Sequence, residues 1–327
     1  MRKIQLVLQL LSIISMASLV TPAPVDNGVV KQVGKNVYAF KNIQGLVLNS
    51  MFIVTSKGVI VIEPFNSIHA RKLIKAIRTI TPKPIKYLLI SHNHWDHARG
   101  GKVFSDEGAT VIAHQEAVDW MEEHPSDDLY LPDRTWRGRK QTLCLGEARV
   151  DLNYYGINHG YGMTVFVYKP PNGSPKDNVA YIADLVTPNR VLFASIPDSN
   201  MQEAISTYHK IVQLPFDRVV FSHGPLLDSP PDGTIQDVRN TLQYSVDLDA
   251  AVKQAFKDGK NLIVDPGLLD LPQYKHLAFY EKDFTKNVEK FAFELFIGPY
   301  PWRSVRRYLK PSKIAFPLRR AKRRNNQ

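Results

Sequence analysis

The sequence predicts an α/β fold, and three observations support this prediction. Short β-branched or aromatic runs alternate with segments of helical spacing, as at residues 36–40 and 69–80. Several strand-like runs follow one another too closely for every pair to be separated by a helix, which argues against purely βαβ units. Beyond His223, residues 236–257 and 276–297 have the spacing of two long helices. We therefore expect an α/β domain followed by a helical extension.

The individual elements follow from local patterns. The helix at residues 69–80 has apolar residues at helical spacing and is stopped by Pro82 and Pro84. A compact apolar run at residues 85–90 suits a buried strand. A further helix is expected at residues 201–213. The other expected strands are residues 36–40, 51–55, 59–63, 110–113, 148–154, 164–168, 179–182 and 218–221.

The amino-terminal segment has the anatomy of a secretory signal peptide. Arg2 and Lys3 precede an apolar run, which ends at a polar break, and Ser15 and Ala17 are small residues suited to a cleavage site. We expect residues 1–23 to be removed and the protein to be secreted, without a stable membrane anchor after processing. A retained anchor is the alternative.

Charge is concentrated at the carboxyl end of the 327-residue chain. The formal net charge is +11, but residues 303–324 alone contain ten Lys or Arg and no acidic residue. The body is therefore close to neutral, which does not favour a specific nucleic-acid partner. Residues 303–327 form a basic tail, for which we expect polyanion contact.

Cys144 is the only cysteine, so no intramolecular disulfide can form. It lies between Leu143 and Leu145, and we expect a small buried apolar residue rather than a nucleophile. With 44% apolar residues, the chain can form a sizeable core without cross-links.

The densest chemistry follows the apolar run at residues 85–90. Here His92, His94, Asp96 and His97 place four potential metal ligands within six residues. Imidazoles at i and i+2 after a strand can point into one cleft, and the adjacent Asp and His can serve a second ion. An exposed polar loop is the alternative, but clustered buried polar rings require a compensating charge.

This motif, H-x-H-x-D-H after a strand, resembles the signature of the metallo-β-lactamase superfamily. Three later segments are similar to that family in the same order, namely YYGINHGYGMTVFVY with His159, AYIADLVTP with Asp184 and RVVFSHGPL with His223. The resemblance implies an αββα sandwich over residues 30–226, with a helical extension at residues 227–302 packed on it.

The resemblance also implies a dinuclear centre. In the family pattern His92, His94 and His159 would hold one ion, Asp96, His97 and His223 the other, and Asp184 would bridge them. Nitrogen and oxygen ligands suit two Zn²⁺ ions per chain, although they also suit iron or manganese. Asp96 and Asp184 are the candidate catalytic residues.

The sequence departs from the family pattern at several positions. Glu63 stands where many members have Asp and offers a carboxylate that could orient a ligand. Ala183 and Ser222 replace frequent glycines, which we expect to affect substrate fit more than metal binding. Ser91 is expected to matter little. The aromatic candidates for substrate contact are Trp136, Tyr155 and Tyr161, while the role of Trp95 stays open. The remaining histidines, expected to be structural or exposed, are His69, His114, His124, His209 and His276.

These features together predict a secreted zinc-dependent hydrolase that acts on a small molecule. A metal-bound hydroxide would attack an ester, lactone, thioester or lactam-type bond. Asp184 argues against a true β-lactamase, because those members usually lack aspartate at that position. Two alternatives are an iron-dependent oxygenase of the same superfamily and a non-catalytic secreted matrix or binding protein that retains the fold.

Overall fold

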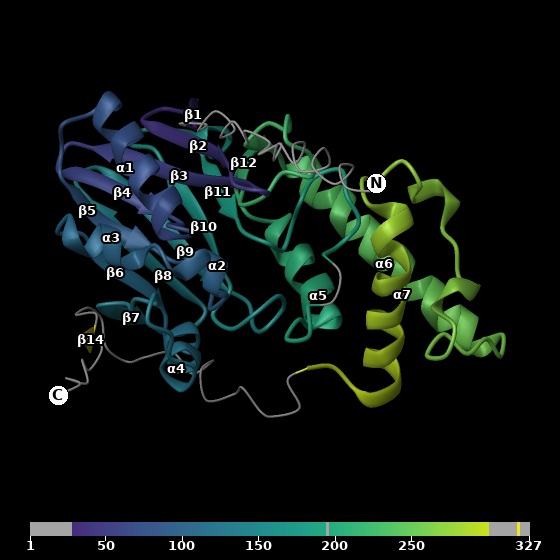
Figure 1. The fold of residues 1–327 in the computed structure, drawn as a ribbon. Helices are drawn as coiled ribbons and strands as arrows, with labels where there is room; N and C mark the ends of the chain where they lie inside the picture. Colours follow the sequence, from purple (N-terminus) through teal and green to yellow (C-terminus); the bar gives the residue numbers. More distant parts are fainter. Residues whose placement is uncertain (1–27, 194–195, 301–318, 321–327) are drawn as a thin grey trace, which may run out of the picture.

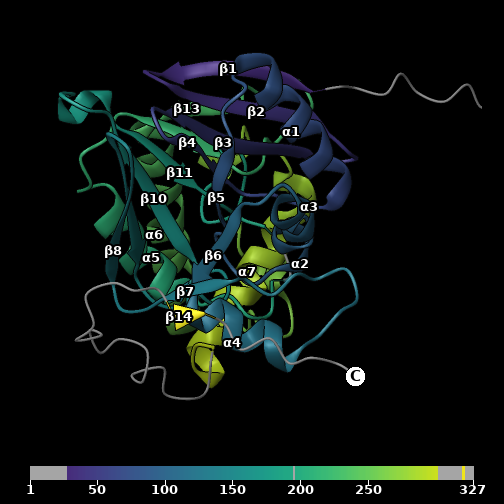
Figure 2. The ribbon, with the colours of Figure 1, turned by 90° about the vertical axis from the view of Figure 1, so that its left-hand side faces the viewer.

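The computed structural model describes residues 28–193, 196–300 and 319–320, the last two in their backbone only. Two sheets pack face to face, and helices lie outside them (Figure 1; Figure 2). The expected signal peptide at residues 1–23, and the basic tail apart from residues 319–320, lie outside the described residues.

The first sheet contains eight strands in the order β1-β2-β3-β4-β5-β6-β7-β14. Strands β1 to β4 pair antiparallel, whereas β4, β5, β6 and β7 pair parallel. The strands are β1 (Val29–Gly34), β2 (Val37–Ile43), β3 (Val47–Thr55), β4 (Gly58–Ile62), β5 (Ile85–Leu89), β6 (Thr110–His114), β7 (Arg134–Trp136) and β14 (Arg319–Arg320). The central parallel strands β4 and β5 are almost entirely apolar, as expected for strands covered on both faces.

The second sheet has the order β13-β12-β11-β10-β9-β8. Its strands are β8 (Lys140–Leu145), β9 (Ala148–Tyr154), β10 (Thr164–Lys169), β11 (Val179–Ile182), β12 (Arg218–Phe221) and β13 (Asp232–Thr234). Within this sheet, as far as the chain is described, only β11 and β12 pair parallel. Side chains from both sheets, including Met51, Ile62, Phe166 and Tyr181, form one continuous core between them.

Helices cover the outer faces of the sandwich and the side where the last helices of the described chain lie. The first sheet is covered by α1 (Ser67–Ile80), α3 (Gly101–Asp106) and α4 (Gln115–Glu123), whose apolar side chains form a second core with it. Asn66 caps α1, because its side-chain oxygen accepts the amide protons of Ile68 and His69. The α/β class and the αββα arrangement predicted from the sequence are confirmed.

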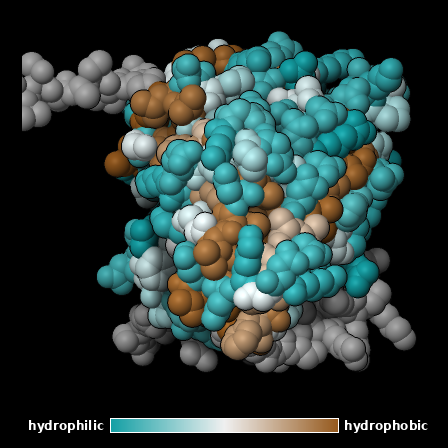
Figure 3. All heavy atoms as spheres, turned by 90° about the vertical axis from the view of Figure 1, so that its right-hand side faces the viewer, coloured by the Kyte–Doolittle hydropathy of each residue, from teal (hydrophilic) through white to brown (hydrophobic). Residues whose placement is uncertain are grey.

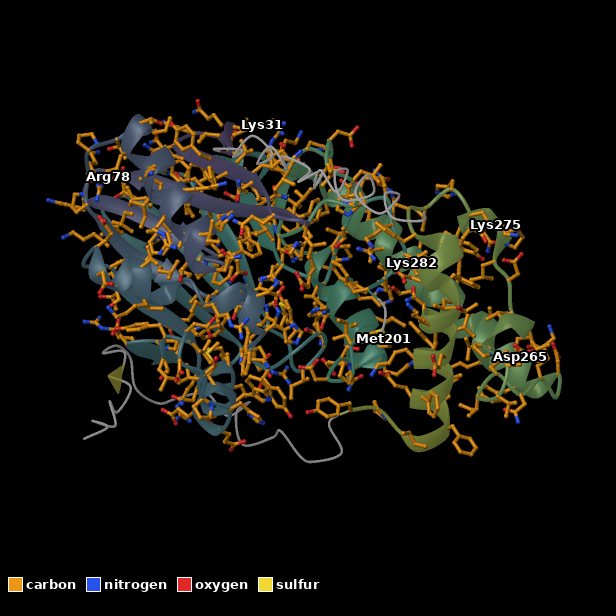
Figure 4. All side chains as sticks on the ribbon, viewed as in Figure 1. Lys31, Arg78, Met201, Asp265, Lys275 and Lys282 are labelled. Carbon is orange, nitrogen blue, oxygen red and sulfur yellow. The ribbon has the colours of Figure 1, made fainter. Side chains whose placement is uncertain are left out.

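The helical extension consists of α6 (Ile235–Lys257) and α7 (Tyr280–Ile297), which pack against α5 (Met201–Ile211) and form a third apolar core. Glu294 of α7 accepts the amide proton of Met201, the first residue of α5, at 2.9 Å. Figure 4 labels Met201, which faces the extension. Figure 3 shows the face formed by the extension, where apolar patches lie among hydrophilic side chains. None of the helices in the described residues has the length and hydropathy needed to cross a membrane.

Two expectations are wrong. Strand β13 lies beyond His223, where no strand is expected from the sequence. Two of its three residues, Asp232 and Gly233, have weak strand propensity, so its pairing with β12 decides its conformation. Cys144 is exposed rather than buried. It lies on the edge strand β8, where alternation turns Leu143 to the core and Cys144 to the opposite face.

Candidate metal centre

The seven predicted side chains converge at one end of the sandwich, where parallel strands end. His92, His94, Asp96 and His97 follow β5, and the last two lie in the short helix α2 (Trp95–Ala98). His159 lies between β9 and β10, Asp184 follows β11, and His223 follows β12. Loops at the carboxyl ends of parallel strands meet at one edge, so distant sequence segments form a single site.

The seven side chains form two clusters that share Asp184. In each cluster the potential ligand atoms lie within 4.8 Å of one another. The first cluster contains His92, His94, His159 and Asp184, and the second contains Asp96, His97, His223 and Asp184. Asp184 Oδ2 lies 3.2 Å from Nε2 of both His97 and His159. A carboxylate in this position can serve both clusters.

One buried ring nitrogen in the first cluster, Nε2 of the fully buried His92, has no hydrogen-bond partner within the described residues. Nε2 of His159, which is 6% exposed, has the shared carboxylate of Asp184 3.2 Å away. Leaving the His92 nitrogen unpaired is costly, and a bound cation would remove that cost. The donor set of the two clusters, imidazole nitrogens and carboxylate oxygens, therefore fits a pair of divalent ions.

In each of three clustered histidines, His223, His94 and His92, one ring nitrogen contacts another protein atom, which leaves the second nitrogen of the ring for an ion. His223 Nδ1 donates to the carbonyl oxygen of Val47 at 2.8 Å, which leaves Nε2 as the lone-pair atom. His94 instead contacts Asp198 through Nε2 at 3.0 Å, which leaves Nδ1 for an ion. Ser91 Oγ lies 2.7 Å from Nδ1 of His92, and both residues are fully buried.

Glu63 contacts the second cluster from the end of β4. Its side chain is fully buried, and Oε2 lies 3.2 Å from Nδ1 of His97. The carboxylate role expected for Glu63 therefore has a defined partner. Glu63 also has a φ of 73°, in the left-handed region that non-glycine residues rarely adopt, so the surrounding fold holds it in a strained conformation.

Three contacts around the centre go beyond what the sequence indicates. Asp198, in the loop before α5, gives no signal in the sequence because a lone Asp in a loop is common. Ser222 donates to Oδ1 of Asp184 at 2.7 Å, so its substitution for glycine affects the centre directly. Ser91 contacts His92, and the expectation that it matters little is not supported by this buried contact.

The loops that carry His92 and His159 are fastened to each other. The amide of Tyr161 donates to Asn93 Oδ1 at 2.7 Å, and the amide of Asn93 donates to the Tyr161 carbonyl at 3.1 Å. Gly160 lies between them, where an added Cβ would approach Asn93 Oδ1 to 2.8 Å and His94 Nε2 to 3.1 Å. This close approach requires a glycine.

Burial and the charges of neighbouring groups determine the pKa values of the side chains in the two clusters. Burial lowers the pKa of His92 well below its usual value, and the neighbouring histidines add to this effect. Burial also acts to lower the pKa of His97, but Asp184, Asp96 and Glu63 outweigh it and raise that pKa. Asp184 shows the converse: burial opposes ionisation, yet His97 and His223 hold its pKa well below the usual range. The charged carboxylate is thus favoured even without an ion.

The aromatic candidates lie differently from expectation. Trp136 is 3% exposed and packs edge-on against His114 in the core, which does not support substrate contact. Tyr161 is 5% exposed, and its hydroxyl lies 2.7 Å from that of Tyr300. Two other aromatic rings lie beside the centre. The fully buried Phe65 has its centroid 5.0 Å from that of His97 and 5.6 Å from that of His223, and the partly buried Phe193 has its centroid 5.8 Å from that of His223. Trp95 is partly buried, with the Arg99 guanidinium 4.7 Å from its ring centroid.

Comparison with known proteins agrees with this geometry. The model of the metallo-beta-lactamase superfamily matches residues 44–223, which include all seven predicted side chains. The chain belongs to this superfamily, and the predicted resemblance is confirmed. A solved metallo-beta-lactamase from Pontibacter korlensis superposes with a TM-score of 0.56 at 18% identity, covering 67% of this chain and 99% of that one. At this identity the likeness shows the fold alone.

One curated relative is named for another activity, O-demethylation. The 2,4-dinitroanisole O-demethylase subunit alpha of Nocardioides sp. (strain JS1661) is 26% identical over 179 residues, or 54% of this chain. The matched segment is 52% of that relative, so this chain matches about half of its length.

Proposed function

We propose that this protein is a hydrolase that uses two divalent ions, and that these ions are zinc, which suits the ligand set. The proposed substrate is a small molecule with an ester, lactone, thioester or lactam-type bond, which the protein cleaves. The observation that carries the proposal is the pair of clusters that share Asp184. When bound, a pair of divalent ions activates water and polarises the bond to be cleaved. Serine or cysteine nucleophiles are not required.

The chain's own residues provide the frame for this chemistry. The ring nitrogens of His223, His94 and His97 that would not bind an ion are fixed by contacts with Val47, Asp198 and Glu63, respectively. The Asp96 carboxylate is 61% exposed, so it lies where an incoming water or substrate can reach it. Partial burial acts to raise the pKa of Asp96, but His97 outweighs it and lowers that pKa to about 2. Asp96 therefore accepts hydrogen bonds at neutral pH. The proposed ligands are His92, His94 and His159 for one ion and Asp96, His97 and His223 for the other, with Asp184 shared.

The proposal is tested by elemental analysis combined with a hydrolytic panel. We expect about two metal ions per chain and turnover of at least one ester, lactone, thioester or β-lactam. The matched variants are Asp96→Asn, at the centre, and Asp106→Asn, at the exposed end of α3. Only the first should lose activity. A folded protein that binds no transition metal after dialysis against zinc would disprove the proposal.

A second candidate is O-demethylation of an aromatic methyl ether. The relative with 26% identity is named as a 2,4-dinitroanisole O-demethylase subunit, and its match extends over 179 residues of this chain. Hydrolysis of such an ether releases methanol, whereas oxidation by a monooxygenase releases formaldehyde and consumes O₂ together with two electrons from a reductant. Incubation with 2,4-dinitroanisole in air, with ascorbate as reductant and both products measured, separates a hydrolase from the iron-dependent oxygenase alternative. Formaldehyde formation would replace the hydrolytic proposal.

We also propose that the protein is secreted after removal of about the first 17 to 23 residues. The basic start and apolar run support this. Amino-terminal sequencing of protein from the medium tests it, and an intact Met1 on a cell-retained product would disprove it.

The basic tail is proposed to bind polyanions, because ten positive charges at residues 303–324 have no acidic residue among them. Full-length protein should elute from heparin at higher salt than protein truncated after residue 302. Equal elution would disprove the proposal. A tail that binds heparin on a protein without turnover would favour the non-catalytic matrix alternative.

A further inference from the structure

Phe193 lies directly beside the candidate metal centre. Its ring centroid is 5.8 Å from that of His223 and 6.3 Å from that of His159, with edge-to-face geometry in both pairs. These two histidines belong to different clusters, so Phe193 lies against both halves of the centre. The ring is only partly buried, which leaves part of it open to contact with another molecule.

Arg190 fixes the position of the Phe193 ring. The guanidinium of Arg190 lies 4.3 Å from the Phe193 ring centroid and 4.5 Å from that of Phe279. One planar cation therefore lies against two aromatic rings, an arrangement that favours a single orientation. Arg190 also donates to Asp283 Oδ2 at 3.2 Å and to the carbonyl of Val191 at 3.1 Å.

The helical extension supplies this backing. Phe279 stands at the N-cap position of α7, and Asp283 lies in the first turn of that helix. Lys282, between them in sequence, is labelled in Figure 4. The loop and the extension are also joined through backbone. The amide of Val191 donates to the Ala278 carbonyl, and the amide of Ala278 donates to the Asn189 carbonyl. The extension thus determines where Phe193 lies relative to the two clusters.

We propose that Phe193 is the aromatic wall of the substrate site and selects substrates with a planar aromatic ring next to the bond that is cleaved, while Arg190 is a positioning residue that acts through Phe193. The proposal rests on the proposed function of the centre. An aromatic group stacked on Phe193 gains a contact that a saturated ring of the same size does not make. Positive charge on Arg190 lies behind the wall rather than in contact with substrate, because its side chain is only 10% exposed.

Binding of two matched acids to the metal-loaded protein tests the proposal. Benzoate and cyclohexanecarboxylate have the same charge and similar size, but only benzoate is planar and aromatic. We expect calorimetry to show roughly three- to tenfold tighter binding of benzoate to the wild type, the value of one aromatic pair. Phe193→Leu keeps an apolar side chain without the ring and should bring the ratio close to one.

The controls separate a wall from general damage. Phe296→Leu makes the same change at a position of α7 that is 72% exposed, and it should keep the wild-type ratio. Arg190→Lys keeps the charge without the planar stack and should lower the ratio less than Phe193→Leu, with little change for cyclohexanecarboxylate. An unchanged ratio in Phe193→Leu, equal weakening of both acids, or no preference in the wild type would overturn the proposal.

The measurement is independent of turnover. A protein that prefers benzoate but hydrolyses no compound of the panel keeps the aromatic wall and loses the proposed function. A protein that hydrolyses aliphatic substrates but does not prefer benzoate keeps the proposed function and loses the aromatic wall.

Discussion

His92 and His114 are both fully buried, yet their surroundings differ in a way that separates a candidate ligand from a structural histidine. The ring of His114 has both nitrogens engaged: Nδ1 accepts the amide proton of Glu116, and Nε2 donates to the Gly138 carbonyl, each at 3.3 Å. His92 has one engaged nitrogen, and its Nε2 has no hydrogen-bond partner among the described residues. Burial lowers the pKa of both rings, so low pKa alone does not identify the metal centre.

The environments also differ in charge. His114 stacks on Tyr154 with ring centroids 4.0 Å apart, and Tyr154 donates its hydroxyl proton to Glu116, which closes the network. His92 instead lies against three further imidazoles, with ring centroids 4.4 Å from His94 and His97 and 5.5 Å from His159. A buried nitrogen lone pair that accepts no hydrogen bond and lies among several imidazoles is an arrangement that a bound cation stabilises.

Substitution of the shared carboxylate should give the largest effect. Asp184→Asn keeps the shape but removes the charge that offsets repulsion between two cations. We expect the metal content to fall from about two ions to about one and kcat to fall on the order of 10³-fold, with little change in KM. Glu116→Gln removes a buried carboxylate from the His114 network and should leave the metal content unchanged. Wild-type metal content in Asp184→Asn would break the distinction between the two regions.

Metal removal should separate the two histidines by stability. At an ion concentration about 1,000 times the dissociation constant, binding stabilises the folded state by about 4 kcal/mol, which for a chain of this size is on the order of 10 °C in Tm. We expect a chelator to lower Tm by that amount in the wild type and by much less in His92→Ala. His114→Phe should unfold at a lower temperature but keep the chelator-dependent shift. Thermal unfolding followed by circular dichroism measures all three, and an equal chelator effect in both variants contradicts the prediction.

The pH dependence of stability should report His114. Burial lowers its pKa from 6.5 to about 3, so the unfolded chain binds a proton that the folded chain does not. Stability from this group is therefore complete above pH 6.5 and is lost as pH falls toward 3, by about 1.4 kcal/mol per pH unit in that window. Urea unfolding of chelator-treated protein at pH 7.0, 6.0 and 5.0 should show a slope that is smaller by this amount in His114→Phe. An identical slope would place the His114 ring in solvent rather than in the core.

The smallest effect is expected at Ser91. Removing its hydroxyl leaves Nδ1 of His92 without its partner and so loosens the orientation of the ring. We expect Ser91→Ala to weaken metal affinity roughly tenfold, at the lower end for contacts behind a ligand. Competition with a fluorescent zinc indicator measures this. Ser126→Ala, in an exposed loop, is the control, and equal affinities in the two variants would show that Ser91 has no orienting role.

Most of the residues that form the centre can be predicted from the sequence. The H-x-H-x-D-H run, with His159, Asp184 and His223, can be found because clustered potential ligands after apolar runs are rarely structural. Asp198 and Phe193 cannot, since their contacts with the centre depend on the path of a loop that has no periodicity. Trp136 is buried in the core, and the sequence of a strand end does not reveal which way an aromatic side chain faces. At Cys144, strand alternation overrides the effect of apolar neighbours.

His97 and His223 are 126 residues apart in the chain, and their Nε2 atoms are 3.4 Å apart because β5 and β12 belong to different sheets that pack together. Contacts of such separation form late when a chain folds, since much of the chain must be ordered before they gain anything. The complete centre cannot exist until the sheets have docked. The rate at which a refolding chain captures an ion should therefore report the last step of assembly, and separation of the sheets on unfolding should release the ion before either sheet loses its own hydrogen bonds.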